Sequence, residues 1–294
     1  MASVTIVIPA YNSVPFLEET VACALAQSDP AERIVIVDDG SPDASFALAQ
    51  RLAAAHPAVE AMQRPNGGAA AARNTGFRRA TTDFVLFLDA DDRLLPDAIT
   101  LHLAAFARHP QAVMVFGSNH RIAADGAHIG VSLNSEQNVT RADLAMYVTP
   151  CPSQCLYRRT ALEAVGGFNE TLRPGDEIDL NIRLLDVGQV RSHPGFVMDY
   201  RHHPNQGIKN VYRNSSEHLR ALALNIGPEG AHPDPVLYRR ARRKWLARYG
   251  YRQHMAALGA LRHGRWPQIW PATRLAALGA WARLMGAEWQ PPRT

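Results

Sequence analysis

Three carboxylates follow one short apolar run in this sequence. Residues 84–88 (Phe-Val-Leu-Phe-Leu) have the composition of a strand buried on both faces, and Asp89, Asp91 and Asp92 come directly after it. Acidic side chains this close together repel one another unless a cation lies between them. Because hard divalent cations bind carboxylate and phosphate oxygens, the spacing favours a metal site. Taken alone, such a turn more often caps the next helix. The residues at the other strand ends must therefore determine whether a metal site or a helix cap is the better interpretation.

Two earlier predicted strands also end in residues that could bind a ligand. Residues 4–8 are followed by Pro9-Ala-Tyr-Asn12, and the strand over 33–38 ends in Asp38 and is followed by Asp39. Ligands of open α/β sheets bind beyond the carboxyl ends of the strands, where these residues would lie. Tyr11 offers a surface on which a base can stack, and Asp39 offers an acceptor for a base N–H group.

Two predicted helices add further candidates. An alanine-rich helix that begins near Asn66 carries Arg73, whose guanidinium can form a fork onto phosphate. Asp176 and Glu177 begin a later helix, where the helix dipole favours carboxylates, and either could serve as a general base. The whole set fits a nucleoside diphosphate, a divalent metal and a second reactant beside them.

The periodicity indicates the elements that must position these groups. Strands at 4–8, 33–38 and 59–63 alternate with helices over 14–27 and 41–55, the second capped by Ser41 with Pro42 in its first position. This order predicts a parallel, doubly wound sheet with right-handed crossovers. From residue 118 the periodicity weakens, which predicts loops and antiparallel additions, and the last expected strand spans 197–200.

The composition is that of a globular protein of 294 residues with an uneven charge. Residues 236–294 hold twelve Lys and Arg side chains and one acid, Glu288. Three cysteines form no disulfide framework, and neither a signal segment nor a membrane span is evident, so we expect a cytoplasmic protein. We expect no nucleic-acid partner.

Pro- and Gly-containing residues 228–236 read as a linker, which predicts a body over 1–227 and a helical C-terminal extension over 228–294. Within the extension an apolar stripe runs along a basic helix, and further helices are expected near 252–263 and 271–285. The extension also holds Trp266, Trp270, Trp281 and Trp289. Basic helices with tryptophan fit either a peripheral contact with an anionic membrane through 236–294, at its inner face, or a helical hairpin packed on the body.

Several of these stretches, in order over residues 3–207, resemble the inverting family 2 glycosyltransferases of the GT-A fold. The matching stretches are Val7-Ile-Pro-Ala-Tyr-Asn12, Ile34-Val-Ile-Val-Asp-Asp-Gly-Ser41, Asn66 to Gly76, Phe87-Leu-Asp-Ala-Asp-Asp92, Gly166-Gly-Phe-Asn169, Gly175 to Leu184 and Tyr200-Arg-His-His203. The resemblance implies a mixed, mainly parallel α/β sheet with helices on both faces. It also implies a nucleotide-sugar-binding half over 1–115 and an acceptor-binding half over 116–227.

The implied activity is metal-dependent transfer of a sugar, with inversion, from a nucleoside-diphosphate sugar, such as a UDP-sugar, to a sugar or lipid-linked acceptor in polysaccharide or glycoconjugate synthesis. The cofactor would be Mn²⁺ or Mg²⁺. By resemblance, the donor is held by Pro9, Tyr11, Asn12, Asp38, Asp39, Asn66, Arg73, Asp89, Ala90 and Arg201, and the metal by Asp89, Asp91 and His203.

The sequence departs from the family pattern at the expected base. The family usually has Glu-Asp before a Leu-X-X-Arg helix, whereas this chain has Asp176-Glu177. Alignment on Arg183 puts Glu177 at the base position, with Asp176 as the alternative. A catalytically inactive sugar-binding module of the same fold, which this exchange favours, and a sugar nucleotidyltransferase are the competing hypotheses. The second would require a Gly-rich phosphate loop with a cation after the first strand, which Pro9-Ala-Tyr-Asn12 lacks.

Overall fold

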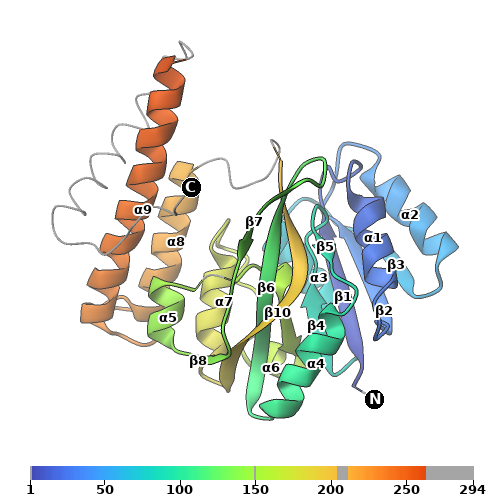
Figure 1. Cartoon of the computed structure of the whole chain (residues 1–294), viewed down its shortest axis with the longest axis horizontal. Coiled ribbons are helices and arrows are strands. Elements are labelled where there is room, and N and C mark those ends of the chain that lie inside the picture. The colour runs from blue at the N-terminus through green and yellow to red at the C-terminus, as the bar shows by residue number, and fades with distance from the viewer. Residues whose placement is uncertain (1, 149, 204–210, 263–294) are drawn as a thin grey trace. The chain divides into compact units, whose positions relative to one another are not determined.

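The computed structural model describes residues 2–148, 150–203 and 211–262 (Figure 1). The elements follow one another as β1 (Val4–Ala10), α1 (Leu17–Leu25), β2 (Arg33–Asp38), α2 (Ser45–Ala55), β3 (Val59–Gln63), α3 (Ala69–Phe77), β4 (Phe84–Phe87), β5 (Arg93–Leu94), α4 (Ala98–Arg108), β6 (Ala112–Ala123), β7 (His128–Ser132), β8 (Gln137–Val139), α5 (Arg141–Met146), a 3₁₀ turn (Pro152–Gln154), β9 (Cys155–Arg158), α6 (Arg159–Ala164), α7 (Asp176–Leu184), β10 (Gln189–His202), α8 (Val211–Ile226) and α9 (Pro235–Arg262). Contacts divide them into two compact units.

The first unit, within residues 2–140, 150–171 and 183–203, is built on one mixed sheet. Its strand order is β3-β2-β1-β4-β9-β6-β10-β5, with β7 paired to β6 and β8 to β10. The first four strands in this order are parallel, whereas β9 runs antiparallel to both β4 and β6. Because β1, β2 and β4 are parallel neighbours, their carboxyl ends share one edge of the sheet, as the sequence predicted.

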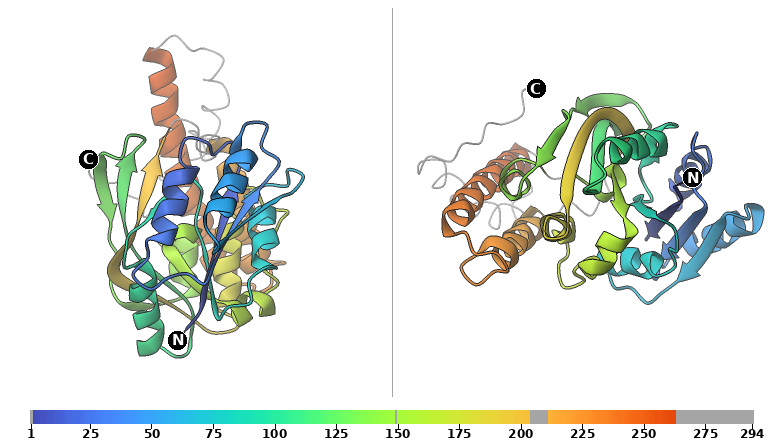
Figure 2. Two further views of the ribbon diagram at one scale, coloured as in Figure 1. Left: turned by 90° about the vertical axis from the view of Figure 1, so that its right-hand side faces the viewer. Right: turned by 90° about the horizontal axis from the view of Figure 1, so that it is seen from below.

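Helices cover both faces of this sheet (Figure 2). On β1, Ile6 and Ile8 belong to a core cluster that includes Leu17 and Val21 of α1. Val7 points the opposite way, because successive side chains of a strand alternate between faces. It lies so close to α3 that a Cβ on Gly76 would come within 2.3 Å of its Cγ1 atom. Glycine at 76 therefore allows α3 to approach β1 and β2.

The expected boundaries of two elements were wrong. Helix α2 begins at Ser45, and Ser41 does not cap it. The Ser41 hydroxyl instead accepts the N–H of Asn12, while its own N–H donates to Asp38 Oδ2. The last strand, β10, spans fourteen residues rather than four, and its pairing with β6 has register shifts around Pro194 and Gly195, which obscure the pattern.

The second unit, within residues 141–148, 172–182 and 211–262, contains α5, most of α7, and the paired helices α8 and α9 (Figure 1). Helix α9 is continuous to Arg262, where the sequence suggested two separate segments. The expected helix over 271–285 and the four tryptophans after 262 lie outside the described residues. No helix in the described part of the chain combines the length and apolarity that crossing a bilayer needs. The predicted domain boundary at 227/228 remains a prediction.

Candidate active site

The acidic turn after β4 is held from several sides. The Asp92 N–H donates to the Asp89 carbonyl at 3.0 Å, which closes the turn. The Asp92 side chain is buried and accepts the Arg201 N–H on Oδ1 (3.0 Å) and the Ser153 hydroxyl on Oδ2 (2.8 Å). Burial, together with the charges of Asp91 and Asp89, raises the pKa of Asp92 well above its usual range. Asp92 therefore has a structural role in the acidic turn.

Two hydroxyl groups complete this support. Ser153, fully buried in the 3₁₀ turn, also accepts the N–H of Asp89 at 3.0 Å. The hydroxyl of Thr20 on α1 donates to the carbonyls of Ala90 (3.0 Å) and Asp92 (2.9 Å). The backbone of the turn is thus fixed by side chains from two other parts of the first unit. Neither hydroxyl was expected from the sequence, because a single buried Ser or Thr carries no pattern.

Asp91 and His203 face each other at the outer side of the turn. His203 Nε2 lies 2.8 Å from Asp91 Oδ2, and its ring packs 4.9 Å from that of Phe16. Burial and then the charge of Asp89 raise the pKa of Asp91. The sequence separates the two residues by 112 positions, and the structure brings them together.

The Asp91–His203 pair is suited to a divalent metal whose remaining ligands are phosphate oxygens and water. Within the described residues, no group of three or more His, Cys, Asp or Glu side chains forms a complete protein cage. Mg²⁺ and Mn²⁺ are commonly held by one or two side chains together with phosphate oxygens and water. A carboxylate oxygen and an imidazole nitrogen suit Mn²⁺, and their 2.8 Å separation is close to the roughly 3 Å between adjacent ligands of an octahedral ion.

Asp89 points to a different partner. Its Oδ1 accepts from Arg73 at 2.7 Å, and the Arg73 guanidinium lies 5.3 Å from the ring centre of Phe168. Arg73 is buried on α3, while Asp89 is partly exposed. The Arg73–Asp89 pair therefore presents a positive and a negative group beside Asp91. Phe168 is itself buried.

Arg201 supports the turn with its side chain as well as its backbone. Its Nε donates to the Asp91 carbonyl (2.9 Å), one terminal nitrogen donates to the Ala124 carbonyl (2.9 Å), and the other pairs with Glu19 (2.5 Å). The guanidinium also lies over the Phe16 ring. These contacts give Arg201 a role in holding the turn, and its contact with a donor stays a prediction.

The residues that follow β1 and β2 belong to a second cluster of polar side chains. Asp39 is buried and caps the start of α3: Gly67 N–H reaches Oδ1 at 3.0 Å, Gly68 N–H reaches Oδ2 at 2.6 Å, and Arg64 pairs with Oδ1 at 2.6 Å. Gly68 has φ +90°, a conformation that glycine adopts without strain. Arg64 was not expected from the sequence.

The neighbours of Asp39 shape the same edge. Asn66 donates its side-chain amide to the Asp39 carbonyl at 2.9 Å, and Asp38 Oδ2 accepts from Gln63 at 3.0 Å. Tyr11 is half exposed, and Asn12 has φ +52°. Pro9, whose backbone continues β1, is paired with Val37. All the residues proposed for donor and metal therefore lie in the first unit.

The candidate bases lie in the second unit. Asp176 and Glu177 begin α7, as predicted. Asp176 is buried, whereas the Glu177 side chain is 22 % exposed. Glu177 Oε2 accepts the N–H of Gly175 at 3.2 Å, and Oε1 lies 3.3 Å from Nε2 of His218 on α8. Of the two carboxylates, Glu177 is the more exposed to solvent.

Comparison with known proteins gives the family context of this geometry. The model of the family described as "Glycosyl transferase family 2" matches residues 5–166. The chain is 30 % identical to the chondroitin synthase of Pasteurella multocida over 222 residues, which are 74 % of this chain and 22 % of that protein. The chain spans less than half the length of each of the first curated relatives it matches.

Two solved structures share the fold. S. aureus TarS 1-349, crystallised with UDP-GlcNAc, has a TM-score of 0.68 at 18 % identity and covers 96 % of this chain and 87 % of its own. The mannosyltransferase PcManGT from Pyrobaculum calidifontis, crystallised with GDP-Man and Mn²⁺, has a TM-score of 0.64 at 21 % identity, over 96 % and 80 % of the two chains. These likenesses confirm the predicted GT-A fold class.

Proposed function

This chain belongs to glycosyl transferase family 2, and from that premise we propose that it transfers a sugar from a nucleoside-diphosphate sugar to an acceptor hydroxyl in the synthesis of a polysaccharide or another glycoconjugate. The observation that carries the proposal is the Asp91–His203 pair beside Arg73–Asp89 on the acidic turn. A metal at the pair and a cation next to it would suit a diphosphate. The chondroitin synthase among the relatives supports the acceptor class.

The hydrogen bonds of Asp39 favour a UDP-sugar. A carboxylate has about four acceptor positions, and three donors from Arg64, Gly67 and Gly68 already occupy this one. One position therefore remains for a further N–H group, and uracil presents one such group between its two carbonyls. Guanine presents two adjacent donors and would require Arg64, the only side chain among the three present donors, to move aside as well.

The metal would be held by Asp91 and His203, and when bound it would neutralise charge on the departing diphosphate. The other residues do the positioning. Arg73 would orient a diphosphate oxygen, and Asp92, Ser153 and Thr20 keep Asp91 in place without reorganisation during the reaction. Such preorganisation lowers the barrier because nothing needs to move as charge develops.

A carboxylate of α7 would act as the base. We assign this role to Glu177, which would accept the proton of the acceptor hydroxyl while that oxygen attacks the anomeric carbon from the face opposite the diphosphate, so that the product is inverted. Asp176 is buried and is the alternative base. An inactive binding module is the second candidate function, favoured by the exchanged order of Asp176 and Glu177.

Calorimetric titration with UDP, GDP and TDP, each with Mn²⁺ and with EDTA, tests the donor site. We expect Mn²⁺-dependent binding of UDP that is stronger than that of GDP. Binding that EDTA does not weaken would overturn the metal assignment, and no binding of any of the three would overturn the proposed function. If the wild-type protein binds nucleotide but does not turn over a nucleotide sugar, this result would favour the inactive module.

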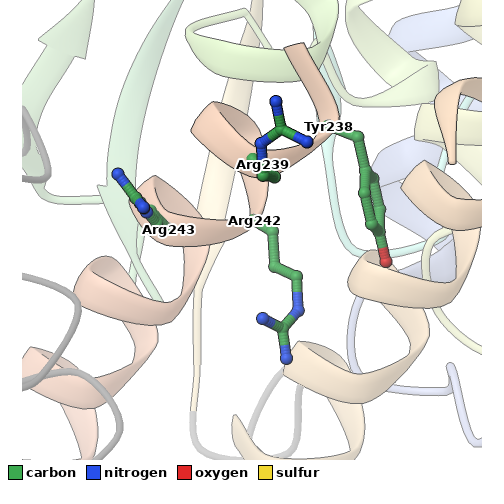
Figure 3. Close-up of a pocket in the computed structure, with 4 residues that line it drawn as sticks. All are labelled: Tyr238, Arg239, Arg242 and Arg243. Atoms are coloured by element: carbon green, nitrogen blue, oxygen red, sulfur yellow. The ribbon is translucent and has the colours of Figure 1, made fainter. Parts of the chain in front are cut away.

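Helix α9 supports a peripheral contact with anionic membrane. Its exposed side includes Arg239, Arg240 and Arg242, and a hollow of about 450 Å³ is lined by Tyr238, Arg239, Arg242 and Arg243 (Figure 3). Basic side chains near an anionic surface each contribute about 1 kcal/mol to binding. Replacing Arg239, Arg240 and Arg242 by Glu should release the protein from phosphatidylserine liposomes in a flotation assay, whereas Arg51→Glu on α2 should not. Equal flotation of both would remove this contact from the proposal.

A further inference from the structure

In the described part of the second unit, the start of α7 contacts α8, and α8 in turn packs on α9. Helices α8 and α9 pack along each other (Figure 1), and His218 of α8 lies between the start of α7 and α9. Its ring is 5.2 Å from that of Trp245 and 5.6 Å from that of Tyr249. The sequence indicated only an apolar stripe on α9, and it gave no sign that the stripe surrounds a residue in contact with Glu177.

Gly175 makes this close approach possible. Its φ of +101° lies in the region that favours glycine, and a Cβ there would come within 3.1 Å of the Glu217 carbonyl oxygen and 3.2 Å of the His218 ring. The turn that precedes α7 therefore lies directly against α8. The same glycine uses its N–H to bind Glu177 Oε2. Any side chain at position 175 would push α8 and its histidine away from α7.

The donors and acceptors in this cluster form a connected chain. The Tyr249 hydroxyl bonds to His218 Nδ1, and His218 Nε2 lies 3.3 Å from Glu177 Oε1. An ionised Glu177 only accepts hydrogen bonds, so Nε2 must carry a proton to bond with it. In the neutral ring Nδ1 is then an acceptor, which the Tyr249 hydroxyl satisfies by donating. This tautomer is assigned from the network of partners.

Trp245 holds the chain from behind. Its indole N–H donates to the carbonyl of Ala145 on α5 at 2.8 Å, and its ring stacks on Tyr249 with centroids 5.5 Å apart. Trp245 and Tyr249 are both buried, with exposed fractions of 3 % and 2 %. The packing of the Trp245 and Tyr249 rings therefore directs the Tyr249 hydroxyl toward His218, and solvent does not determine this direction.

We propose that His218 and Tyr249 are positioning residues for Glu177: Tyr249 fixes the histidine tautomer, and the Nε2–H group of His218 holds the carboxylate toward the acceptor side. The proposal rests on the proposed role of Glu177 as base. Gly175 binds one oxygen of Glu177 and His218 the other, so the two contacts together set the orientation of the carboxylate. Helices α8 and α9 then belong to the catalytic apparatus of the second unit.

Substitutions of the three residues in the full chain, assayed as UDP release from UDP-glucose, UDP-N-acetylglucosamine and UDP-glucuronate with Mn²⁺, test this chain of contacts. Glu177→Gln should abolish turnover. Tyr249→Phe keeps the aromatic stack and removes only the hydroxyl, and His218→Ala removes the whole ring. We expect each to lower kcat about 10- to 100-fold with the donor KM unchanged, because a misplaced base of this kind costs up to about 100-fold.

His218→Gln separates positioning from packing. Its side-chain amide can still donate to Glu177, so it should recover most of the kcat lost in His218→Ala. Tyr147→Phe, at a half-exposed tyrosine of the same unit, should have wild-type kcat. Retained turnover in Glu177→Gln would overturn the base assignment. No turnover of the wild type with any of the UDP-sugars would overturn the proposed function itself. If Glu177→Gln is inactive while Tyr249→Phe and His218→Ala keep wild-type kcat, the positioning role is wrong. The positioning role is also wrong if the loss of kcat in each variant only parallels its loss of melting temperature and His218→Gln restores none of the kcat lost in His218→Ala.

Discussion

Replacing Ser153 by alanine tests how the acidic turn is supported. The hydroxyl is fully buried, accepts the Asp89 N–H and donates to Asp92 Oδ2. Alanine would leave both groups without this partner in a site that water does not reach. A buried group left unsatisfied costs about 1–3 kcal/mol, and more when it is charged. We therefore expect Ser153→Ala to lower the free energy of unfolding by roughly 2–5 kcal/mol.

The same change should also affect the proposed metal site. Asp91 lies between Asp89 and Asp92, so a turn that loses the Ser153 bridge no longer holds Asp91 opposite His203. We expect Mn²⁺-dependent UDP binding to weaken at least about tenfold, which corresponds to about 1.4 kcal/mol. Urea unfolding followed by circular dichroism measures the first quantity, and calorimetric titration measures the second.

Ser28 provides the matched control. Its hydroxyl also donates to a carboxylate, Asp97 Oδ1 at 2.6 Å, but at an exposed position. Water can replace this bond, so Ser28→Ala should change the unfolding free energy by less than about 0.5 kcal/mol. The reasoning would be refuted if Ser153→Ala were as mild as Ser28→Ala, or if it destabilised the fold without affecting nucleotide binding.

Three further changes test other parts of the molecule. Asp91→Ala should abolish Mn²⁺-stimulated UDP binding in calorimetry and leave the metal-independent part, and undiminished stimulation would contradict the ligand assignment. Because the pKa of Asp92 is raised in the fold, its contribution to stability is fully present below its unfolded pKa of about 3.9 and is lost as the pH rises through its folded value. Urea unfolding should then show wild type losing more stability than Asp92→Asn between pH 4 and pH 8, and parallel curves would oppose this. Gly175→Ala should lower the melting temperature and kcat together, since its φ and the Glu217 carbonyl both oppose a Cβ; wild-type values in thermal unfolding and UDP release would show that the turn can adapt.

The sequence predicted those parts of the site that follow directly from local pattern. A continuous apolar run ending in acids has few interpretations, so the β4 turn with Asp89, Asp91 and Asp92 was expected at its observed place. The start of α7 at Asp176 was equally readable, because two acids before an apolar face mark a helix N-terminus. Parallel strand order then placed the ends of β1, β2 and β4 on one edge.

Contacts between distant segments were not predictable in the same way. Ser153, Arg64 and His218 act through partners that are 64, 25 and 41 positions away in the sequence, and nothing in their own surroundings marks them. The Ser41 cap failed for a related reason. Its hydroxyl could serve either the following helix or the β1 loop, and the choice depends on how close Asn12 lies in the folded chain.

The chain of contacts on Glu177 also has a consequence for synthesis. Ribosomes extend a chain at about 5–20 residues per second, so Tyr249 emerges roughly 4–14 s after Glu177. The strands that hold Asp39, Asp91 and His203 are complete once β10 has emerged, whereas the histidine and tyrosine that orient the base arrive later. A nascent chain would therefore acquire its donor-binding unit before its transfer apparatus. Fragments that end before α9 are therefore expected to bind nucleotide while releasing little UDP from UDP-sugars.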